Sequence, residues 1–587
     1  MRRALAIAIS ISALFYLALG GGSTEVVAGP PQNCGITTLD GTIDVSVLED
    51  GLALKCGPGE RIRTRDRFAE AEPGRKQRRR PLLSFFSIAD VQLADEESPL
   101  RGEWADKCED HPFESAFRPQ ETMVPHLLNG HIRAANAIAK KGSPVLDDDF
   151  DFAIGLGDLA DNNQLNELRW IIDIFDGKQL INPDSGDEGY DGVQARDPEG
   201  APEDPLTSPV KGESIIELAN EPFWATGLRP DGRLPWYSLP GNHDVKVQGT
   251  VPNEAGWRQF AEQWAVGSLK VQDLPPDQQQ DACEDPAGNF GDPDWYSNLP
   301  DGTTQPVPPD PKRRLLSRED WVQQHFKTTG LPDGHGYDHN RCRTRKGDLL
   351  ERACYSFTKG RFHFIGVDTN PHEGFEGGNV DRPQFRWLRR ELKAHSTKYF
   401  KIDGDVVKNE NGRNKLIVVF THHTIGSTDN EETPNAMNGR DLRRLLLRFP
   451  NVIMHANGHT HQNKIWGREN REWDHGYWEV NTSAIADLPH QSRTIEIADN
   501  RDGTLSIFAV VFNALVAPDP RTIDWKADDP TDEVALGGAE ATSNENWFAS
   551  AATELGFYDP QGDLTRIGRR GDRNVELLLP APAWFRN

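Results

Sequence analysis

Several short apolar runs, each ending in a cluster of polar side chains, are the feature of this sequence that most constrains its fold. Runs of this length bounded by turn signals are typical of buried strands. The first run, Leu82 to Ile88, is followed by "ADVQLAD". The other stretches, each an apolar run with its polar end, are "FDFAIGLGDLAD" (150–161), "LPWYSLPGNHD" (234–244), "RFHFIGVDTN" (361–370), "KLIVVFTHH" (415–423) and "NVIMHANGHTH" (451–461).

Helical patterns lie between these predicted strands. One covers 125–141, and another covers 381–395, with Asp381 as its N-cap and Phe385, Leu388 and Leu392 on one face. Strands that alternate with helices predict an α/β fold with substantial parallel sheet. Ligands of such folds gather beyond the carboxyl ends of the strands, which is where the polar clusters lie.

The regions outside this alternation predict the domain organisation. Arg2 and Arg3, an apolar run and small residues near Gly29 predict a signal peptide over 1–29, with an uncleaved membrane anchor as the alternative. An N-terminal segment over 30–80 precedes the main domain, 81–514. Insertions at about 176–233 and 245–350 are expected to form loops over the site. The acidic, proline-rich stretch 515–587 is expected to be a C-terminal extension, peripheral or partly disordered.

The cysteines indicate the redox compartment of the protein, and the net charge indicates which partners it favours. An even number of cysteines in an exported chain favours disulfide bonds, and the local pairs Cys34 with Cys56 and Cys342 with Cys354 are preferred; Cys108 and Cys283 are the other two. The formal net charge of −26 makes a nucleic-acid polymer an unfavourable partner, while small anionic substrates remain open. No apolar run after the signal peptide is long enough to span a membrane, and the sequence does not define the oligomeric state.

Five polar strand ends carry the chemistry. Singly, each has a common structural role, because an aspartate at a strand end is often a turn or cap residue and a lone histidine is most often packed. Five in order, all rich in Asp, Asn and His, favour a metal centre. They are Asp90-Val-Gln92, Gly157-Asp158-Leu-Ala-Asp161, Gly241-Asn242-His243-Asp244, Thr421-His422-His423 and Gly458-His459-Thr460-His461.

This order resembles the calcineurin-like metallophosphoesterase superfamily, whose pattern is D-x-H, G-D-x-x-D, G-N-H-D/E, H and G-H-x-H. The resemblance covers about 82–510. It implies a four-layer α-β-β-α sandwich of the metallophosphoesterase type, here with long loop insertions. It also implies two divalent ions and the hydrolysis of a phosphate ester or phosphoanhydride by a hydroxide that bridges them.

The resemblance also implies a role for each residue. Asp158 would bridge the ions, Asp90, Gln92 and His461 would complete one site, and Asn242, His422 and His459 would complete the other. His243 would give a proton to the leaving group, and Asp244 and Asp161 would orient His243 and the ligands. His423 is expected to pack or to contact substrate rather than to bind an ion.

Gln92 stands where most of the superfamily has histidine. Its amide oxygen makes the first site richer in hard oxygen ligands, which suit Mn²⁺ or Mg²⁺ better than Zn²⁺. D-x-Q also occurs in manganese-dependent ADP-ribose/CDP-alcohol diphosphatases, so Mn²⁺ is the expected ion, with Fe, Mg²⁺ or Zn²⁺ as alternatives. Purple acid phosphatases have a tyrosine where this chain has Asp161, so a stable Fe³⁺ centre is not expected.

The resulting prediction is an exported dinuclear-metal phosphoesterase that acts on a small phosphorylated substrate. The alternative from a different class is a non-catalytic metal-binding scaffold of the same fold. Among enzymes, a nucleotide pyrophosphatase or phosphodiesterase and a phosphomonoesterase remain open, because they share the metal core and differ in the loops around it.

Overall fold

The computed structural model describes residues 34–48, 51–107, 116–186, 189–192, 219–229, 234–253, 257–272, 274–275, 298–300, 302–339, 342, 353–473, 475–514, 541–559 and 563–585. The predicted signal peptide, Cys108, Cys283 and parts of both predicted insertions lie outside these ranges.

One large sheet contains the first three predicted core strands. Its strands β4, β5 and β8 pair in parallel, and β21 and β22 pair antiparallel beside them. In spatial order the sheet consists of β3 (Arg63–Arg65), β23 (Val575–Pro580), β22 (Thr504–Asn513), β21 (Gln491–Asp499), β4 (Arg80–Ile88), β5 (Phe152–Gly155) and β8 (Trp236–Ser238).

A second sheet contains the later core strands. The neighbours β14, β17, β18 and β20 are all parallel to one another, and β13 and β19 close the two edges antiparallel. In spatial order it consists of β13 (Tyr355–Lys359), β14 (Phe362–Gly366), β17 (Leu416–Phe420), β18 (Val452–Asn457), β20 (His475–Asn481) and β19 (Lys464–Asn470).

The two sheets pack face to face through aromatic side chains. The ring centroids of Phe85 and Phe420 are 5.8 Å apart, and those of Phe152 and Phe364 are 5.1 Å apart. Because side chains alternate along a strand, Ile417 and Val419 of β17 point to the opposite face of the second sheet and belong to a separate core cluster. The interface between the sheets is therefore one continuous apolar core.

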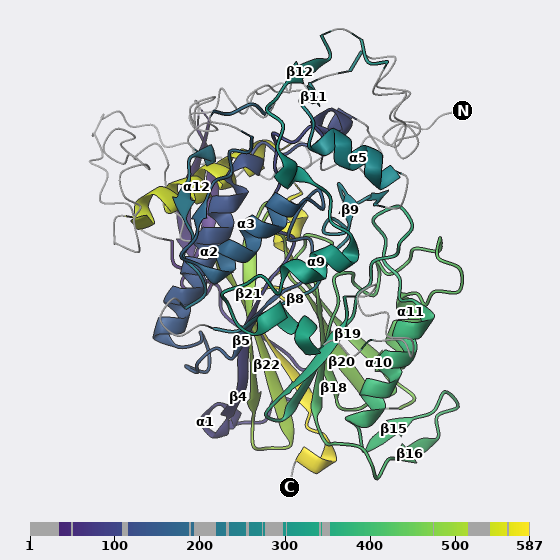
Figure 1. Ribbon diagram of the computed structural model, residues 1–587. Helices are drawn as coiled ribbons and strands as arrows, with labels where there is room; N and C mark the ends of the chain where they lie inside the picture. The colour runs from purple at the N-terminus through teal and green to yellow at the C-terminus, as the bar shows by residue number, and fades with distance from the viewer. Residues whose placement is uncertain are drawn as a thin grey trace, which may run out of the picture.

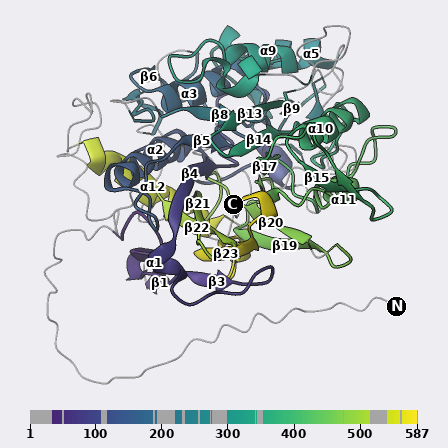
Figure 2. The same ribbon diagram turned by 90° about the horizontal axis from the view of Figure 1, so that it is seen from below.

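Helices cover the outer faces of both sheets, as Figures 1 and 2 show. On the first sheet lie α2 (Val124–Lys141), α3 (Leu165–Asp176) and α12 (Ala541–Tyr558). On the second lie α10 (Arg382–Ala394) and α11 (Gly439–Leu446), whose leucines share the core cluster of Ile417. As predicted, Asp381 is the N-cap of α10, and its side chain accepts from the Gln384 N–H (2.7 Å). The predicted α/β class is confirmed, and these contacts are consistent with the α-β-β-α order.

Shorter elements fill the connections. The remaining helices are α1 (Arg75–Arg78), α5 (Trp257–Ala265) and α9 (Arg318–Gln324). Two-stranded pairs are β1 (Gly41–Leu48) with β2 (Gly51–Pro58), β6 (Leu180–Ile181) with β7 (Phe223–Trp224), β9 (Lys246–Val247) with β10 (Val251–Pro252), β11 (Leu269–Val271) with β12 (Thr304–Pro306), and β15 (Lys398–Phe400) with β16 (Val406–Lys408). Among the described helices, none combines the length and apolar character needed to cross a membrane.

One strand near each end of the described chain belongs to the first sheet. From the stretch predicted to be peripheral, β23 pairs antiparallel with β22, and β3 of the N-terminal segment pairs in parallel with β23 (Figure 2). The expectation of a peripheral extension is thus wrong for 575–580. The alternating pattern in "VELLLP" buries Leu577 and Leu579 in the core, and this long-range pairing leaves no signal in local composition.

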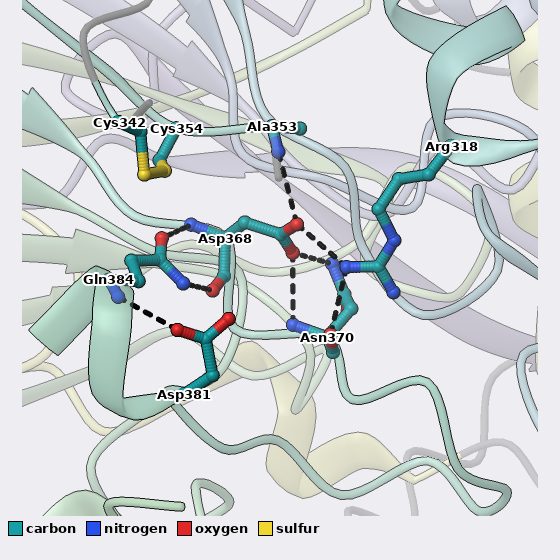
Figure 3. Close-up of a disulfide and its surroundings, with 8 residues drawn as sticks. All are labelled: Arg318, Cys342, Ala353, Cys354, Asp368, Asn370, Asp381 and Gln384. Atoms are coloured by element: carbon teal, nitrogen blue, oxygen red, sulfur yellow. Dashed lines mark hydrogen bonds and ion pairs between the residues drawn. A yellow bond between two sulfur atoms is a disulfide. The ribbon is translucent and has the colours of Figure 1, made fainter. Parts of the chain in front are cut away.

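Both preferred disulfide pairs are confirmed. Cys34 and Cys56 are joined with their Cα atoms 4.7 Å apart, and Cys342 and Cys354 with theirs 5.8 Å apart. Beside the second bond, Asp368 accepts from the Ala353 N–H (3.2 Å) and from Arg318 Nη1 (2.7 Å), as Figure 3 shows. Asn370 donates to the carbonyl of Pro240 (2.9 Å), directly before Gly241. The disulfide-linked segment is therefore tied to one of the five polar strand ends.

Candidate metal centre

The polar strand ends of the two sheets meet at one edge of the molecule. Asp90, Asp158 and Asn242 follow the parallel strands β4, β5 and β8 of the first sheet. His422 and His459 follow β17 and β18 of the second sheet. Parallel strands bring their carboxyl ends to the same edge, so residues hundreds of positions apart come together there.

Five of the seven predicted ligands have a left-handed backbone. The φ angles are 50° at Asp90, 44° at Gln92, 51° at Asp158, 71° at His459 and 52° at His461. Such angles are uncommon for residues other than glycine, and they concentrate at functional sites where the surrounding structure holds them. The backbone therefore turns sharply at the end of these strands in order to aim the side chains inward.

Two glycines of the motifs allow the strand ends to approach one another. A Cβ atom on Gly241 would lie 2.0 Å from Asp158 Oδ1, and one on Gly458 would lie 2.4 Å from Asp90 Oδ2. Both distances are far below van der Waals contact, and the side chains in question are carboxylates of the centre. The glycines are required for close packing around Asp90 and Asp158.

One half of the centre joins Asp158, Asn242, His422 and His459. His422 Nε2 lies 3.0 Å from Asp158 Oδ2 and 3.0 Å from Asn242 Oδ1. His459 Nδ1 lies 3.1 Å from the same Asn242 oxygen. Two ligands that bind one ion at right angles, each ~2.1 Å from it, are themselves ~3 Å apart. The spacing of these donors therefore fits a divalent ion.

The orientation of His422 is fixed by its other ring nitrogen. His422 Nδ1 lies 2.9 Å from the carbonyl oxygen of Leu156, which can only accept. Nδ1 therefore carries a proton, and Nε2 faces the cluster as the nitrogen that would bind an ion, as in most histidines that bind metals.

The other half contains Asp90 and His461. His461 Nε2 lies 3.6 Å from Asp90 Oδ1, and His461 Nδ1 contacts Asp487. Asp90 also accepts from the His459 N–H, at 2.8 and 3.0 Å to its two oxygens. A carboxylate that holds one imidazole nitrogen leaves the second nitrogen for an ion, so Asp487 fits the role of the residue that orients His461.

Arg118 contacts Gln92 and so bears on the unusual D-x-Q motif. Its Nη2 donates to Gln92 Oε1 (2.5 Å), its Nε donates to Asp487 Oδ1 (2.7 Å), and its Nη1 lies 3.8 Å from Asp161. An amide oxygen has two lone pairs, so it can accept from Arg118 and still bind an ion. A neutral imidazole has one lone pair and cannot do both. The arginine thus gives a physical reason for glutamine at position 92.

His243 lies beside the centre and is held by Asp161. Its Nδ1 lies 3.1 Å from Asp161 Oδ1 and 3.0 Å from the Asp161 carbonyl, and its backbone N–H donates to Asp158 Oδ1 (2.8 Å). Arg101 forms an ion pair with Asp161 and with Glu121, the latter at 2.5 Å. This leaves His243 Nε2 as the ring nitrogen for exchange of a proton.

Asp244 makes contacts different from those of Asp161. It accepts from the backbone N–H groups of Ala160 (2.9 Å), Gly241 (2.8 Å) and Leu159 (3.2 Å). These bonds tie the loop after β5 to the loop after β8. Asp244 therefore supports the two loops, while Asp161 contacts His243 itself.

His423 is satisfied by the protein on both ring nitrogens. Its Nδ1 lies 2.7 Å from Thr369 Oγ1 and its Nε2 lies 2.8 Å from the carbonyl oxygen of Glu376. It lies near His422 and His459, within a group whose donor atoms are all within 4.8 Å of one another. Because both nitrogens are already occupied, the contacts favour packing over metal binding.

Burial and neighbouring charges shift the pKa values of the side chains in the centre. Burial raises the pKa of Asp90 to about 6. Burial also acts to raise the pKa of Asp158, but the charges of His422 and His243 bring it below its ordinary value. Burial acts to lower the pKa of His243, and the carboxylates of Asp158 and Asp161 outweigh it and raise that pKa. Burial of two charged carboxylates is unfavourable unless cations neutralise them, and bound divalent ions would do so.

Sequence reasoning missed four charged residues of this site. Asp487 follows β20 within "NTSAIADLP", so the rule of polar strand ends extended to one more strand would have found it. Arg101, Arg118 and Glu121 lie in segments with no strand pattern, and the two arginines pair with Asp161 and Asp487, which are distant in sequence. Only the packed structure brings them to the centre.

Comparisons with known proteins give distant likenesses. No protein-family model and no curated protein matches the chain. Two solved structures that match are a dimetal phosphatase from Danio rerio and a purple acid phosphatase from yellow lupin seeds. The first is 12% identical, with a TM-score of 0.28, covering 74% of this chain and all of the other. The second is 10% identical, with a TM-score of 0.28, covering 79% of this chain and 56% of the other.

Proposed function

We propose that this protein is a hydrolase of phosphate esters or phosphoanhydrides that works with two divalent metal ions. One observation carries the proposal: nitrogen and oxygen donors from the two sheets lie about 3 Å apart around His422 and Asn242. Asp158 would bridge the ions, Asp90, Gln92 and His461 would hold one, and Asn242, His422 and His459 would hold the other.

Bound ions would activate water as the nucleophile and neutralise charge on the phosphoryl group. The chain's own residues complete the chemistry. His243, with Nδ1 held by Asp161, would carry a proton on Nε2 and donate it to the leaving oxygen. With Asp90 and Asp158 as the anionic ligands, two divalent ions leave a local charge of about +2, which attracts phosphate to a chain of net charge −26.

Mn²⁺ is the proposed ion. Carboxylate and amide oxygens from Asp90, Asp158, Gln92 and Asn242 are hard ligands, and they outnumber the imidazole nitrogens. Arg118 supports the amide at position 92, because the glutamine oxygen can both accept from it and bind an ion, whereas a neutral imidazole cannot.

We also propose that the protein is exported. The basic and apolar start of the chain supports a signal peptide, and the two disulfide bonds fit an oxidising compartment. Mass spectrometry of the N-terminus of the secreted protein tests this, and cleavage near Gly29 is the expected result.

The test of the main proposal is turnover of p-nitrophenyl phosphate, bis(p-nitrophenyl) phosphate and nucleoside diphosphates by metal-stripped protein with and without Mn²⁺. Asp158→Asn should abolish metal-dependent turnover. Asp149→Asn, the same change at an exposed ion pair with Arg229, should leave turnover intact. Metal binding without turnover of any of these substrates would instead identify a non-catalytic scaffold.

A further inference from the structure

A cavity of about 530 Å³ lies where three distant parts of the chain meet. The N-terminal segment, the turn that follows Asp487 and the C-terminal part of the chain all contribute residues to its walls. Four arginines line it, namely Arg61, Arg63, Arg570 and Arg573. We call it the arginine pocket.

The arginine pocket concentrates positive charge in an acidic protein. Arg573 pairs with Glu60, which also lines the cavity. Arg61, Arg63 and Arg570 are exposed, and none forms an ion pair with any residue that the structure describes. The whole chain has 65 basic and 91 acidic side chains, so a cavity with four arginines and one glutamate departs from the average. Guanidinium groups in one cavity repel one another, and a bound anion relieves that repulsion.

The remaining walls of the pocket are partly apolar. Leu488 and Pro489 line the cavity from the turn after Asp487, and Phe557 and Ile567 line it from the C-terminal part of the chain. Arginines bind phosphate and similar groups through paired N–H donors, while an apolar wall favours a hydrocarbon or aromatic part of the same molecule.

The arginine pocket is next to the metal centre but contains none of its predicted ligands. Leu488 follows Asp487, which holds His461, and Ile567 follows Arg566, whose guanidinium pairs with Asp487. The Asn463 N–H donates to the carbonyl of Arg566 (2.9 Å), which fixes this wall to the strand end that carries His461. The Asp487 segment therefore forms a shared boundary between the two sites.

We propose that the arginine pocket is a binding site for a small molecule that carries a phosphate-like anion and an apolar group. The proposal does not depend on the phosphoesterase function, because the pocket uses no metal ligand. The anion is either a second anionic group of the substrate or part of a separate molecule.

The experiment uses phenylphosphonate, whose C–P bond resists hydrolysis and whose ring and phosphonate match the two kinds of wall. Binding to the metal-stripped full chain is measured by isothermal titration calorimetry. Arg61→Gln/Arg570→Gln should weaken the affinity at least ~10-fold, because two charge-assisted contacts are lost. Arg569→Gln is the matched control, since Arg569 is exposed beside Arg570 but does not line the cavity, and it should leave the affinity unchanged.

Failure of the wild-type protein to bind phenylphosphonate, or equal affinity in the double variant and the control, overturns the proposal. The thermal midpoints of the variants check that the fold is intact, which is expected because both substituted arginines are exposed.

Kinetics of the metal-loaded protein then distinguish the two sources of the anion. If the pocket holds part of the substrate, the double variant raises KM for nucleoside diphosphates and leaves KM for p-nitrophenyl phosphate unchanged. If a separate molecule binds, both KM values stay unchanged while the loss of phenylphosphonate binding persists. Loss of binding without any turnover in the wild type would refute the phosphoesterase function and leave the arginine pocket standing.

Discussion

In the metal centre, Asp90, Asp158 and His422 are almost fully buried and each is held by a neighbouring side chain or backbone group. The arginine pocket lies on the other side of the Asp487 segment, and three of its four arginines are exposed. Chemistry on a bond requires donors held in place, so the centre is built from strand ends inside the core. Recognition of a charged group tolerates movement of long side chains, so surface segments can provide it.

Substitution of His243 is expected to have the largest effect, and it should change activity at the metal centre without changing binding in the arginine pocket. His243→Ala should retain metal but lower kcat by ~10² to 10⁴, because a positioned proton donor is lost. The loss should be smaller with p-nitrophenyl phosphate than with an alkyl phosphate, whose leaving group needs the proton. Steady-state kinetics across leaving groups measures this, and equal losses would rule out proton donation. Phenylphosphonate binding to the metal-stripped variant should not change.

Substitution of Asn242 tests whether this residue binds a metal ion in the centre. Asn242→Ala removes the oxygen that His422 and His459 share, so activity should fall ~100-fold together with the metal content. Metal analysis by inductively coupled plasma mass spectrometry checks the content. Full metal occupancy with normal turnover would mean that Asn242 is not a ligand. Gln462→Ala, a change on the neighbouring strand end whose amide donates to Thr565, is the control and should retain both ions.

Gln92 and Arg118 test whether charged surroundings select the metal. Gln92→His should weaken Mn²⁺ binding by ~10-fold and shift the order of activity towards Zn²⁺, because imidazole cannot accept from Arg118 while it binds an ion. Arg118→Lys in the same chain should relieve part of that loss, since lysine makes fewer directed contacts. Titrations of the four proteins with Mn²⁺, Mg²⁺, Co²⁺ and Zn²⁺ form a double-mutant cycle. Strictly additive effects would show that Arg118 does not act through position 92.

His126 lies beside a helix of the arginine pocket, and its substitution is expected to affect stability rather than activity. Its ring stacks on Phe548 of α12 with centroids 4.0 Å apart, and α12 also carries Phe557 of the pocket. Burial lowers the pKa of His126 to about 4. As the pH falls, His126 is therefore protonated in the unfolded state at a higher pH than in the folded state. Its contribution to the free energy of unfolding is fully present above about pH 6.5 and is lost as the pH drops towards 4. The expected loss attributable to this residue is ~2 kcal/mol between pH 7.5 and pH 5.

Urea unfolding of metal-stripped wild type and His126→Phe at both pH values measures that loss. The variant lacks the bond from His126 to the carbonyl of Ala219, so it should be less stable at pH 7.5, and the difference should shrink at pH 5. A constant difference would show that His126 does not titrate in this range.

Much of the fold could be predicted because its signals are local. The apolar runs before Asp90, Asp158 and His422 lie in β4, β5 and β17, and Asp381 caps α10 as expected. The end of the chain could not be predicted in the same way. The strand β23 joins a sheet whose partner β22 lies more than 60 residues earlier in the sequence, and its acidic and proline-rich surroundings hide it.

The sequence by itself determined the kinds of donors and the strand ends that carry them, because a strand followed by Gly-Asn-His-Asp or Gly-His-Thr-His has a local conformation that short-range rules describe. Only the tertiary structure decided which charges surround those donors. The contacts of Gln92 with Arg118, of His461 with Asp487, and of both chain ends in the arginine pocket join residues that are far apart in sequence. Such contacts depend on how two sheets and their helices pack, and that packing follows from the summed burial of the whole core rather than from any short motif.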